Sequence, residues 1–270
     1  MAMPANGISG WGYSFSRYGN GKGGICRLKH TDMRQYYKWA AGAMASAVIL
    51  AACSKDDKDD QAPPAGIFNK LITVSNFNGD TTTSKAVIYF SLEQEKAGSP
   101  KNLKSADWDV AFGGNANSSI SGNYGADVAE NTTAGKGGPG KGGVLIIDKP
   151  FDQVTRVPDG AVFITTSGGV GLDTAGMFGT TTGWCVYDFA GVLRATKGIG
   201  GNNATTQKHT VWARPDRTII VRTASGNYAK LKITSMYKDA PAEPVTGTER
   251  PYFHFQYVLA APGSTDFTIK

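Results

Sequence analysis

The clearest alternation of apolar and polar positions lies near the end of the chain, in residues 228–235. Leu231 and Ile233 alternate there with Lys230 and Lys232. A period of two places the apolar and the polar set on opposite faces of an extended segment. The pattern therefore predicts a β-strand with one buried face and one solvated face.

The last apolar segment, residues 252–258, repeats this alternation with larger side chains. Phe253, Phe255 and Tyr257 fall on one face, and His254 falls on the other. A row of aromatic side chains on one face of a strand is typical of a sheet that covers a hydrophobic core. We expect the three rings to point into that core and His254 to point away from it.

Other short runs rich in β-branched and aromatic residues predict further strands. They cover residues 71–74, 86–92, 106–112, 143–148, 161–166, 183–189, 209–213 and 219–221. Turn residues separate the runs. The sequence has 35 glycines, which favour turns and bulges over helices, and no segment of the body has the period of an amphipathic helix. We predict a single all-β domain of short antiparallel strands over residues 67–270.

One of these segments could carry a pair of carboxylates. In residues 106–112, Trp108 falls on the same face as Val110 and Phe112, and we expect it to anchor the core. Asp107 and Asp109 then lie on the wet face. They are either solvated strand residues or an acid–base pair, which would make a hydrolytic enzyme the competing hypothesis.

A glycine-rich stretch covers residues 113–143. Its end resembles a phosphate-binding loop only superficially, because Lys141 is followed by glycine instead of Ser or Thr and no helix follows. A long polar insertion in a compact domain is usually either functional or disordered. We therefore expect a loop or flap that covers a ligand.

The beginning of the chain has the features of a secretory signal. Residues 1–32 show no pattern that predicts structure, whereas residues 33–52 combine basic residues with a short apolar run that ends in Leu-Ala-Ala-Cys53. This ending resembles a bacterial lipobox, in which Cys53 becomes the lipidated first residue; an ordinary signal peptide with a chance cysteine is the alternative. Residues 53–66 are acidic and Pro-rich and predict a solvated tether.

The charge of the chain is concentrated in this leader. Residues 1–52 contain six of the 28 Lys and Arg and one of the 22 Asp and Glu, so that the remainder has a net charge of only +1. A nearly neutral body without a basic stripe excludes the electrostatic footprint of a nucleic-acid binder. Apart from Cys26 and Cys53, the only cysteine is Cys185, which we expect to be a buried free thiol.

Catalytic motifs are lacking. His209 and His254 are the only histidines outside the leader, and the sequence contains neither a Gly-x-Ser-x-Gly elbow nor a His-Glu-x-x-His pair. We therefore do not expect an enzyme.

Four segments together resemble a known family. They are residues 106–112, residues 221–233, Tyr237 at a strand end, and the aromatic closing strand. In combination they look like the HmuY family of haem-binding surface lipoproteins of Bacteroidetes. The resemblance implies a protein anchored by its lipid to the outer membrane and exposed at the cell surface, which captures haem and passes it to an outer-membrane transporter.

The resemblance also implies a pair of axial haem ligands on loops at one end of the β-domain, two histidines in some members and two methionines in others. Here the loop-borne candidates are Met177, next to Phe178, and His209. A mixed pair is chemically sound, since both side chains are haem ligands. His254 and Met236 are less favoured, because they lie within or at the end of strands. The alternative is a surface lipoprotein of the same fold that binds a glycan or a protein, or is structural.

Overall fold

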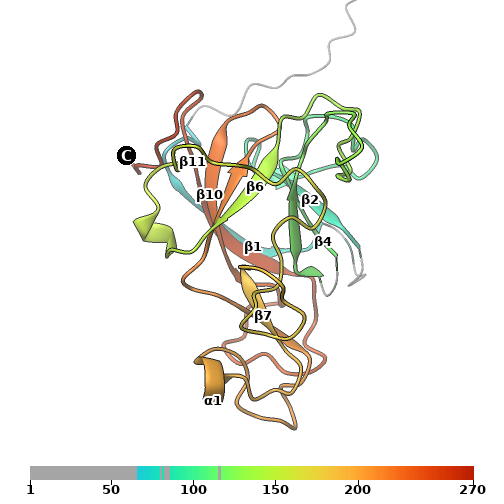
Figure 1. Cartoon of the computed structure of the whole chain (residues 1–270), viewed down its shortest axis with the longest axis vertical. Coiled ribbons are helices and arrows are strands. Elements are labelled where there is room, and N and C mark those ends of the chain that lie inside the picture. The colour runs from blue at the N-terminus through green and yellow to red at the C-terminus, as the bar shows by residue number, and fades with distance from the viewer. Residues whose placement is uncertain (1–65, 80, 82–85, 115–116) are drawn as a thin grey trace, which may run out of the picture. The chain divides into compact units, whose positions relative to one another are not determined.

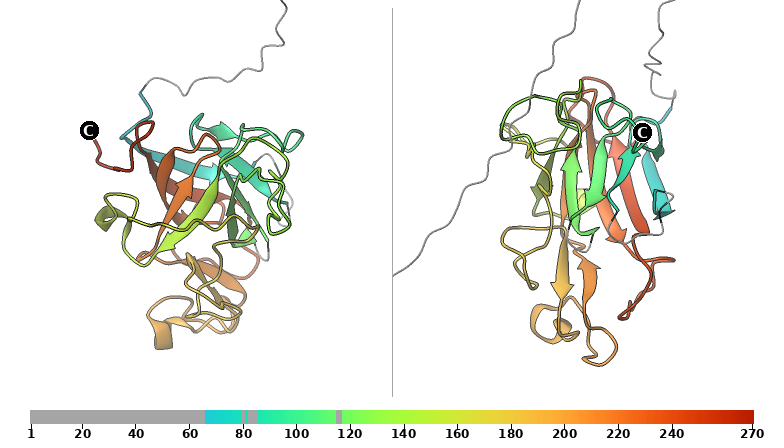
Figure 2. Two further views of the ribbon diagram at one scale, coloured as in Figure 1. Left: turned by 45° about the horizontal axis from the view of Figure 1, so that its top comes forward. Right: turned by 90° about the vertical axis from the view of Figure 1, so that its right-hand side faces the viewer.

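The computed structural model describes residues 66–79, 81, 86–114 and 117–270, and these form two main antiparallel sheets and a separate hairpin (Figures 1 and 2). The five-stranded sheet has the order β1 (Leu71–Phe77), β11 (Phe253–Leu259), β10 (Tyr228–Ser235), β9 (Thr218–Arg222) and β6 (Gly143–Ile147). The four-stranded sheet has the order β3 (Lys96–Ala97), β2 (Ile88–Ser91), β4 (Val110–Gly113) and β5 (Ser119–Gly122). Strands β7 (Cys185–Asp188) and β8 (Thr210–Ala213) form the hairpin. The predicted all-β class with antiparallel strands is confirmed.

Helical structure is minor among the described residues. It consists of α1 (Arg194–Lys197), which lies in the β7–β8 connection, and the 3₁₀ turn η2 (Phe151–Gln153). None of the helical segments in the described part of the chain has the length and apolar character needed to span a bilayer. The leader, Cys53 and the tether up to residue 65 lie outside the described residues.

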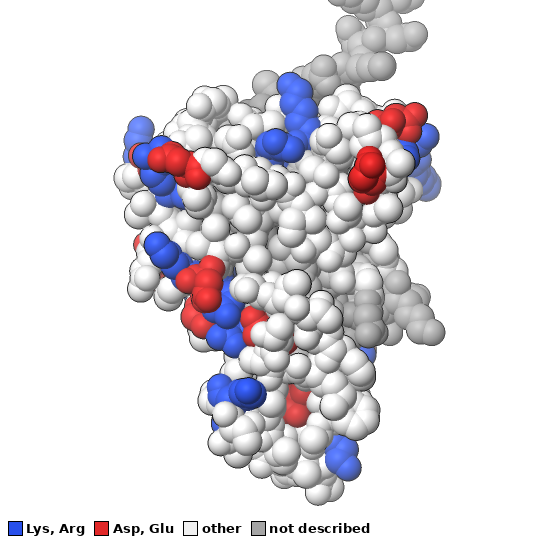
Figure 3. Space-filling model, in the orientation of Figure 1, with Lys and Arg blue, Asp and Glu red and all other residues white. Residues whose placement is uncertain are grey.

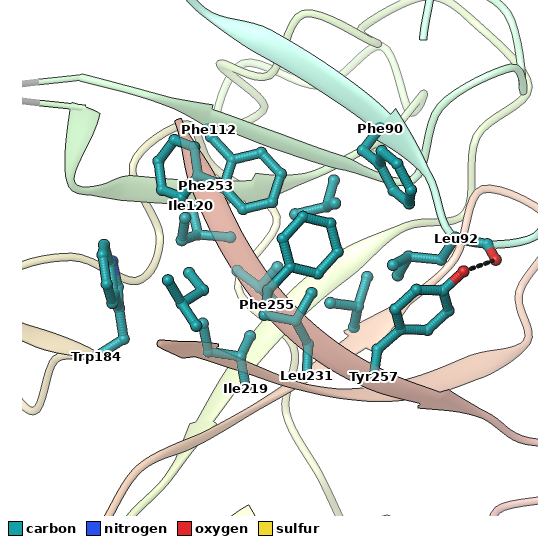
Figure 4. Packing of buried hydrophobic residues seen from close by; sticks show 14 of the residues in the cluster. Phe90, Leu92, Phe112, Ile120, Trp184, Ile219, Leu231, Phe253, Phe255 and Tyr257 are labelled. Carbon is teal, nitrogen blue, oxygen red and sulfur yellow. Dashed lines mark hydrogen bonds between the residues drawn. The ribbon is translucent and has the colours of Figure 1, made fainter. Parts of the chain in front are cut away.

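The main core lies between the two large sheets, and the closing strand supplies its centre (Figure 4). Phe253 and Phe255 are at most 1% exposed, and the centroid of the Phe112 ring lies 4.4 Å from that of Phe253. Phe90 of β2 packs edge-on against Phe255, with ring centroids 5.2 Å apart. Tyr257 lies in the same row and donates a hydrogen bond of 3.0 Å to the carbonyl of Leu92. The prediction that the odd-numbered residues of β11 face the core is confirmed.

The two sheets also approach each other at a pair of glycines. A Cβ added to Gly122 of β5 would fall 2.4 Å from the backbone nitrogen of Gly143 at the start of β6. That separation is far below van der Waals contact, so a side chain here would force the two strands apart. Part of the glycine content therefore serves the close packing of strands.

A buried carboxylate pair joins the four-stranded sheet to the β9–β10 turn. Asp109 accepts hydrogen bonds from the Ala224 N–H at 2.8 Å, from the Leu92 and Glu93 N–H groups and from the Ser91 hydroxyl. Glu93 accepts hydrogen bonds from Thr223, Ser225 and Asn227 of the same turn. Burial raises the pKa of Asp109 to about 6, although the hydrogen bond from Ala224 opposes this shift. We call Glu93, Asp109 and residues 223–227 the carboxylate seam.

The prediction that Asp107 and Asp109 share a wet face is wrong. Asp109 is 1% exposed, and its oxygen atoms are used by the seam. Trp108 is fully buried, as expected, but it packs with Tyr89 and Ala111 in a separate small cluster and not with Val110. The reason is that β4 begins only at Val110, so that the alternation of faces does not extend back to Trp108.

Two further expectations need correction. Residues 161–166 form no strand; Ile164 makes only an isolated bridge to Val144, and Val162 is 80% exposed. The expected loop of residues 113–143 is in fact structured where it is described, since it contains β5 and a network of buried polar side chains. Asn123 donates to the carbonyls of Ser105 and Trp108, both at 2.8 Å. Buried amide groups that satisfy backbone carbonyls fix the path of such glycine-rich segments.

The two ends of the described domain lie together. The Lys270 N–H donates a hydrogen bond of 2.9 Å to the Asn69 carbonyl, and Phe68 forms a parallel bridge with Leu259. The C-terminus lies at the end of the domain away from β7 and α1 (Figures 1 and 2).

Candidate functional site

The β7–β8 hairpin forms a projecting end of the described domain (Figure 1). The connection between its strands contains α1, and Asp188 organises its backbone. One carboxylate oxygen of Asp188 accepts from the Gly191 N–H at 2.7 Å, and the other accepts from the Leu193 and Gly201 N–H groups, each at 2.8 Å. A buried carboxylate that collects three backbone donors gives a long connection a defined path.

A second loop, residues 172–183, packs against the hairpin. The Met177 N–H donates a hydrogen bond of 2.9 Å to the Tyr187 carbonyl of β7. Gly176 lies so close that an added Cβ would fall 2.6 Å from the Tyr187 nitrogen. The lack of a side chain at Gly176 therefore allows Met177 to reach the hairpin.

Buried charges hold the base of this loop. Asp173, which is 3% exposed, forms ion pairs with Arg214 and Arg217, both at 3.3 Å. Burial alone would raise the pKa of the Asp173 carboxyl, but hydrogen bonds from the Ala175 and Gly183 N–H groups and the two arginine charges outweigh it, so that the pKa is lowered. The ionised carboxylate thus ties the loop to the segment between β8 and β9.

The structure brings Met177 and His209 to the same residue. The Nδ1 atom of His209 is hydrogen-bonded to the Tyr187 hydroxyl at 2.7 Å, and Met177 is bound to the backbone of the same tyrosine. His209 is exposed and directly precedes β8, and the Met177 side chain is 45% exposed. Two residues that are 32 positions apart in the sequence are therefore neighbours of Tyr187.

Aromatic rings pack against Tyr187 and His209. The ring centroid of Phe178 lies 5.7 Å from that of Tyr187, and Phe189 packs edge-on against His209 at 4.6 Å. Phe178 is 63% exposed and Phe189 45% exposed. We call Met177, Phe178, Tyr187, Phe189 and His209 the tip patch. Exposed clusters of large apolar side chains mark binding surfaces.

Two residues of the tip patch have backbone conformations that L-residues rarely adopt. Phe178 has φ 68° and His209 has φ 59°. This region is uncommon for non-glycine residues, most of all for bulky ones, and it costs free energy that the surrounding structure must supply. Such outliers cluster at ligand sites, and here one adjoins Met177 and the other is His209 itself.

Charge is sparse around this end of the molecule. On the face drawn in Figure 3, positive and negative side chains are interspersed, and the lower end, where the hairpin lies, carries few of either. The described residues contain no group of three or more His, Cys, Asp or Glu side chains that could hold a metal ion.

The remaining candidates lie in structural positions. A ring nitrogen of His254 is hydrogen-bonded to the Asn76 side chain at 3.0 Å, and burial lowers the pKa of this histidine. Met236 is 1% exposed in the main core. Cys185 is a buried free thiol, as expected, and burial raises its pKa well above the usual value.

Sequence reasoning missed Tyr187 and Phe189 as members of the site. The sequence predicts a strand for residues 183–189, which contain both, and assigns no ligand role to them. The sequence does contain a signal for Phe189. Cys185, Tyr187 and Phe189 alternate along one face of the strand, and Phe189 lies beyond the end of β7, where a large apolar side chain can remain exposed.

Comparison with known proteins decides the family. The family model described as "HmuY protein" matches residues 83–257. The chain belongs to the HmuY family. The predicted family is thus confirmed, and the matched residues include the whole hairpin and all residues of the tip patch. None of the curated proteins compared with this HmuY-family chain matches it.

Solved structures show more distant similarity. An apo HmuY analog from Tannerella forsythia aligns over 72% of this chain and 98% of its own, with 15% identity and a TM-score of 0.37. A HmuY-like haem-binding protein from Bacteroides vulgatus aligns over 70% of this chain and 92% of its own, with 13% identity and a TM-score of 0.36. A lipoprotein from Bacteroides fragilis has the same identity and TM-score, with 70% and 89% covered.

Proposed function

We propose that this HmuY-family protein is a surface lipoprotein that binds haem at the tip patch and passes it to a transporter in the outer membrane. Met177 and His209 are the proposed axial ligands of the iron. Family membership supports the ligand class. The observation that carries the ligand pair is that both residues adjoin Tyr187 through hydrogen bonds, Met177 by its backbone and His209 by its ring.

The donors of the tip patch fit haem. A thioether sulfur and a neutral imidazole nitrogen are both ligands of haem iron. When His209 carries its proton on Nδ1 and donates it to the Tyr187 oxygen, the Nε2 atom keeps its lone pair for the metal. Phe178 and Phe189 offer apolar surface to a flat, largely apolar ligand. In this proposal the chain binds and orients the ligand and catalyses no reaction.

The proposed location depends on the leader. Cys53 would carry the lipid, and residues 53–66 would form the tether that holds the domain outside the cell. An anchor of several acyl chains on one cysteine is stable, whereas a single chain binds a membrane only marginally. Expression with a labelled fatty acid tests this point, because Cys53→Ser must abolish incorporation of the label and release the protein from the membrane fraction.

Titration with hemin tests the proposed ligands. The chain from residue 53 onward, with Cys53→Ser so that it stays unlipidated, is titrated and the Soret band recorded. We expect a shifted and intensified band that is strongly weakened in Met177→Ala and in His209→Ala. His254→Ala is the matched control, since it removes the other histidine of the domain, and it should titrate like the parent.

Two results would contradict the proposal in different ways. Absence of any Soret change at micromolar protein would favour the alternative, a lipoprotein of the same fold with a non-haem ligand. A normal band in both Met177→Ala and His209→Ala would keep haem as the ligand but move its site away from the tip patch.

A further inference from the structure

A cavity of about 420 Å³ lies on the outer face of the four-stranded sheet, and none of the described residues that line it belongs to the tip patch. Its floor is a row across three strands, because Tyr89 of β2 pairs with Ala111 of β4, which pairs with Ser121 of β5. Ser119 lies two residues before Ser121 and shares its face. Gly113, opposite Ser119, keeps the floor open, since a Cβ there would fall 2.8 Å from the side chain of Val87.

The opposite wall consists of two segments that are bound to each other. The hydroxyls of Thr132 and Ser167 lie 2.9 Å apart, and the Ser167 N–H also donates to the Thr132 hydroxyl at 2.9 Å. Ala134 and Gly168 complete this wall. The cavity is therefore built from paired strands on one side and cross-linked loops on the other, and its volume is within the range of small-molecule sites.

Three hydroxyls that line the cavity have no hydrogen-bond partner among the described residues. Tyr89 is 8% exposed, and its ring packs edge-on against Trp108 with centroids 4.9 Å apart, yet its hydroxyl is unpaired. Ser119 and Ser121 likewise make no side-chain hydrogen bond within the described part of the chain. None of the three hydroxyls is among the fully buried unpaired atoms of the described residues, so each contacts solvent and can form a hydrogen bond with a ligand that displaces water from the cavity.

The lining restricts the chemistry of such a ligand. None of the described residues that line the cavity is charged, so an ionised ligand would lose its hydration without a counter-charge. A purely apolar ligand would leave the three hydroxyls unpaired. A neutral ligand with hydroxyls of its own satisfies both conditions, because each hydroxyl both donates and accepts, and its C–H surface can contact Val87, Ala111 and Ala134.

We propose that this cavity is a binding site for a neutral sugar, with the hydroxyls of Tyr89, Ser119 and Ser121 as its hydrogen-bonding groups. The site does not depend on the tip patch, and it gives the domain a second ligand of a different class from haem.

Saturation-transfer NMR with D-glucose, D-galactose and D-mannose tests the proposal on the unlipidated chain from residue 53 onward. We expect saturable transfer to at least one hexose. Tyr89→Phe keeps the ring on Trp108 and removes only the hydroxyl, and Ser121→Ala does the same on β5. Each should weaken binding by about threefold to tenfold, the effect of one hydrogen bond. Ser75→Ala, at an exposed position of β1, is the matched control and should bind like the parent.

Certain outcomes would overturn the proposal. These are no transfer to any of the three hexoses, or transfer that Tyr89→Phe and Ser121→Ala both leave unchanged. If either variant unfolds, as judged by circular dichroism, the amide shifts that the sugar causes in the parent decide the matter: they must centre on β2, β4 and β5. Hemin should leave the sugar signal intact, which separates this site from the tip patch.

Discussion

The carboxylate seam and the tip patch differ in which side chains are buried: the seam buries polar groups, whereas the tip patch exposes apolar ones. In the seam, charged side chains are buried and each oxygen of Asp109 and Glu93 accepts a hydrogen bond. At the tip patch, large apolar side chains are exposed and two backbones have positive φ. Satisfied and buried groups stabilise a fold, whereas exposed rings and strained backbone contribute little to it. The comparison indicates that the sheets contribute most of the stability, whereas the hairpin offers the exposed apolar surface to which the proposed function assigns haem.

The largest expected effect is a difference in stability between two variants that each lose a phenylalanine ring. Phe255→Ala removes a ring from the centre of the core and should lower the free energy of unfolding by about 3–5 kcal/mol. Phe178→Ala at the tip patch should change it by no more than about 0.5 kcal/mol, because the ring is largely exposed. Urea denaturation measures both values. Equal losses would show that the tip patch is part of the stabilising core.

The next effect concerns Asp109 and pH. Its folded pKa of about 6 lies above the usual value of 3.8, so its contribution to stability is fully present below about pH 4 and is lost as the pH rises through 6. The shift corresponds to up to about 3 kcal/mol. Asp109→Asn cannot titrate, and its stability should lack this fall, although the variant is less stable because an amide nitrogen then faces backbone N–H groups. Urea midpoints at pH 5 and pH 7.5 test this; identical pH dependence in both proteins would contradict it.

A moderate effect is expected at the base of the loop that carries Met177. Asp173→Asn removes the charge that Arg214 and Arg217 share and should cost about 1–3 kcal/mol locally. Hydrogen exchange of the Met177 amide, which is bonded to Tyr187, should speed up while the amides of β11 keep their protection. Asp159→Asn, which alters an exposed ion pair with Arg156, serves as the control. Unchanged exchange at Met177 would show that the ion pairs do not hold the loop.

The smallest effect is that of one hydroxyl. Tyr187→Phe removes the hydrogen bond to His209 Nδ1 and should change the free energy of unfolding by about 1 kcal/mol or less. The sensitive readout is the pair of ring ¹⁵N shifts of His209, which should lose the preference for the Nδ1-protonated form, while those of His254 stay unchanged. Hemin affinity should fall by about tenfold at most. If Tyr187→Phe leaves the ring ¹⁵N shifts of His209 unchanged, Tyr187 does not control which ring nitrogen of His209 carries the proton.

The strands that sequence analysis located best are those with one wet and one dry face. In β10 and β11 the predicted apolar face is buried, as expected. The prediction of a solvated opposite face is wrong at Lys230, which is 5% exposed because its ammonium donates hydrogen bonds to the Phe151 and Val154 carbonyls of the segment that covers this face. Where the period is interrupted, the prediction fails. Trp108 precedes the start of β4 and packs on the other side, and the apolar residues 161–166 form only a bridge, with Val162 in solvent.

The environment of Asp109 could not be predicted, since one of its donors, Ala224, is 115 residues away in the sequence. The same holds for the tip patch. The loop positions of Met177 and His209 indicated candidates, but the tyrosine to which both are hydrogen-bonded belongs to a strand between them. Pairings across such separations depend on the tertiary fold, which local patterns do not encode.

The hydrogen bond between Lys270 and Asn69 has a geometric consequence. It closes the domain so that the polypeptide enters and leaves at one pole, while the hairpin occupies the other (Figure 1). In the proposed function, a lipid on Cys53 would attach the domain to the membrane from the pole where Asn69 lies. A transporter that approached the opposite pole would then meet the hairpin first, and haem could be exchanged there without disturbing the attachment.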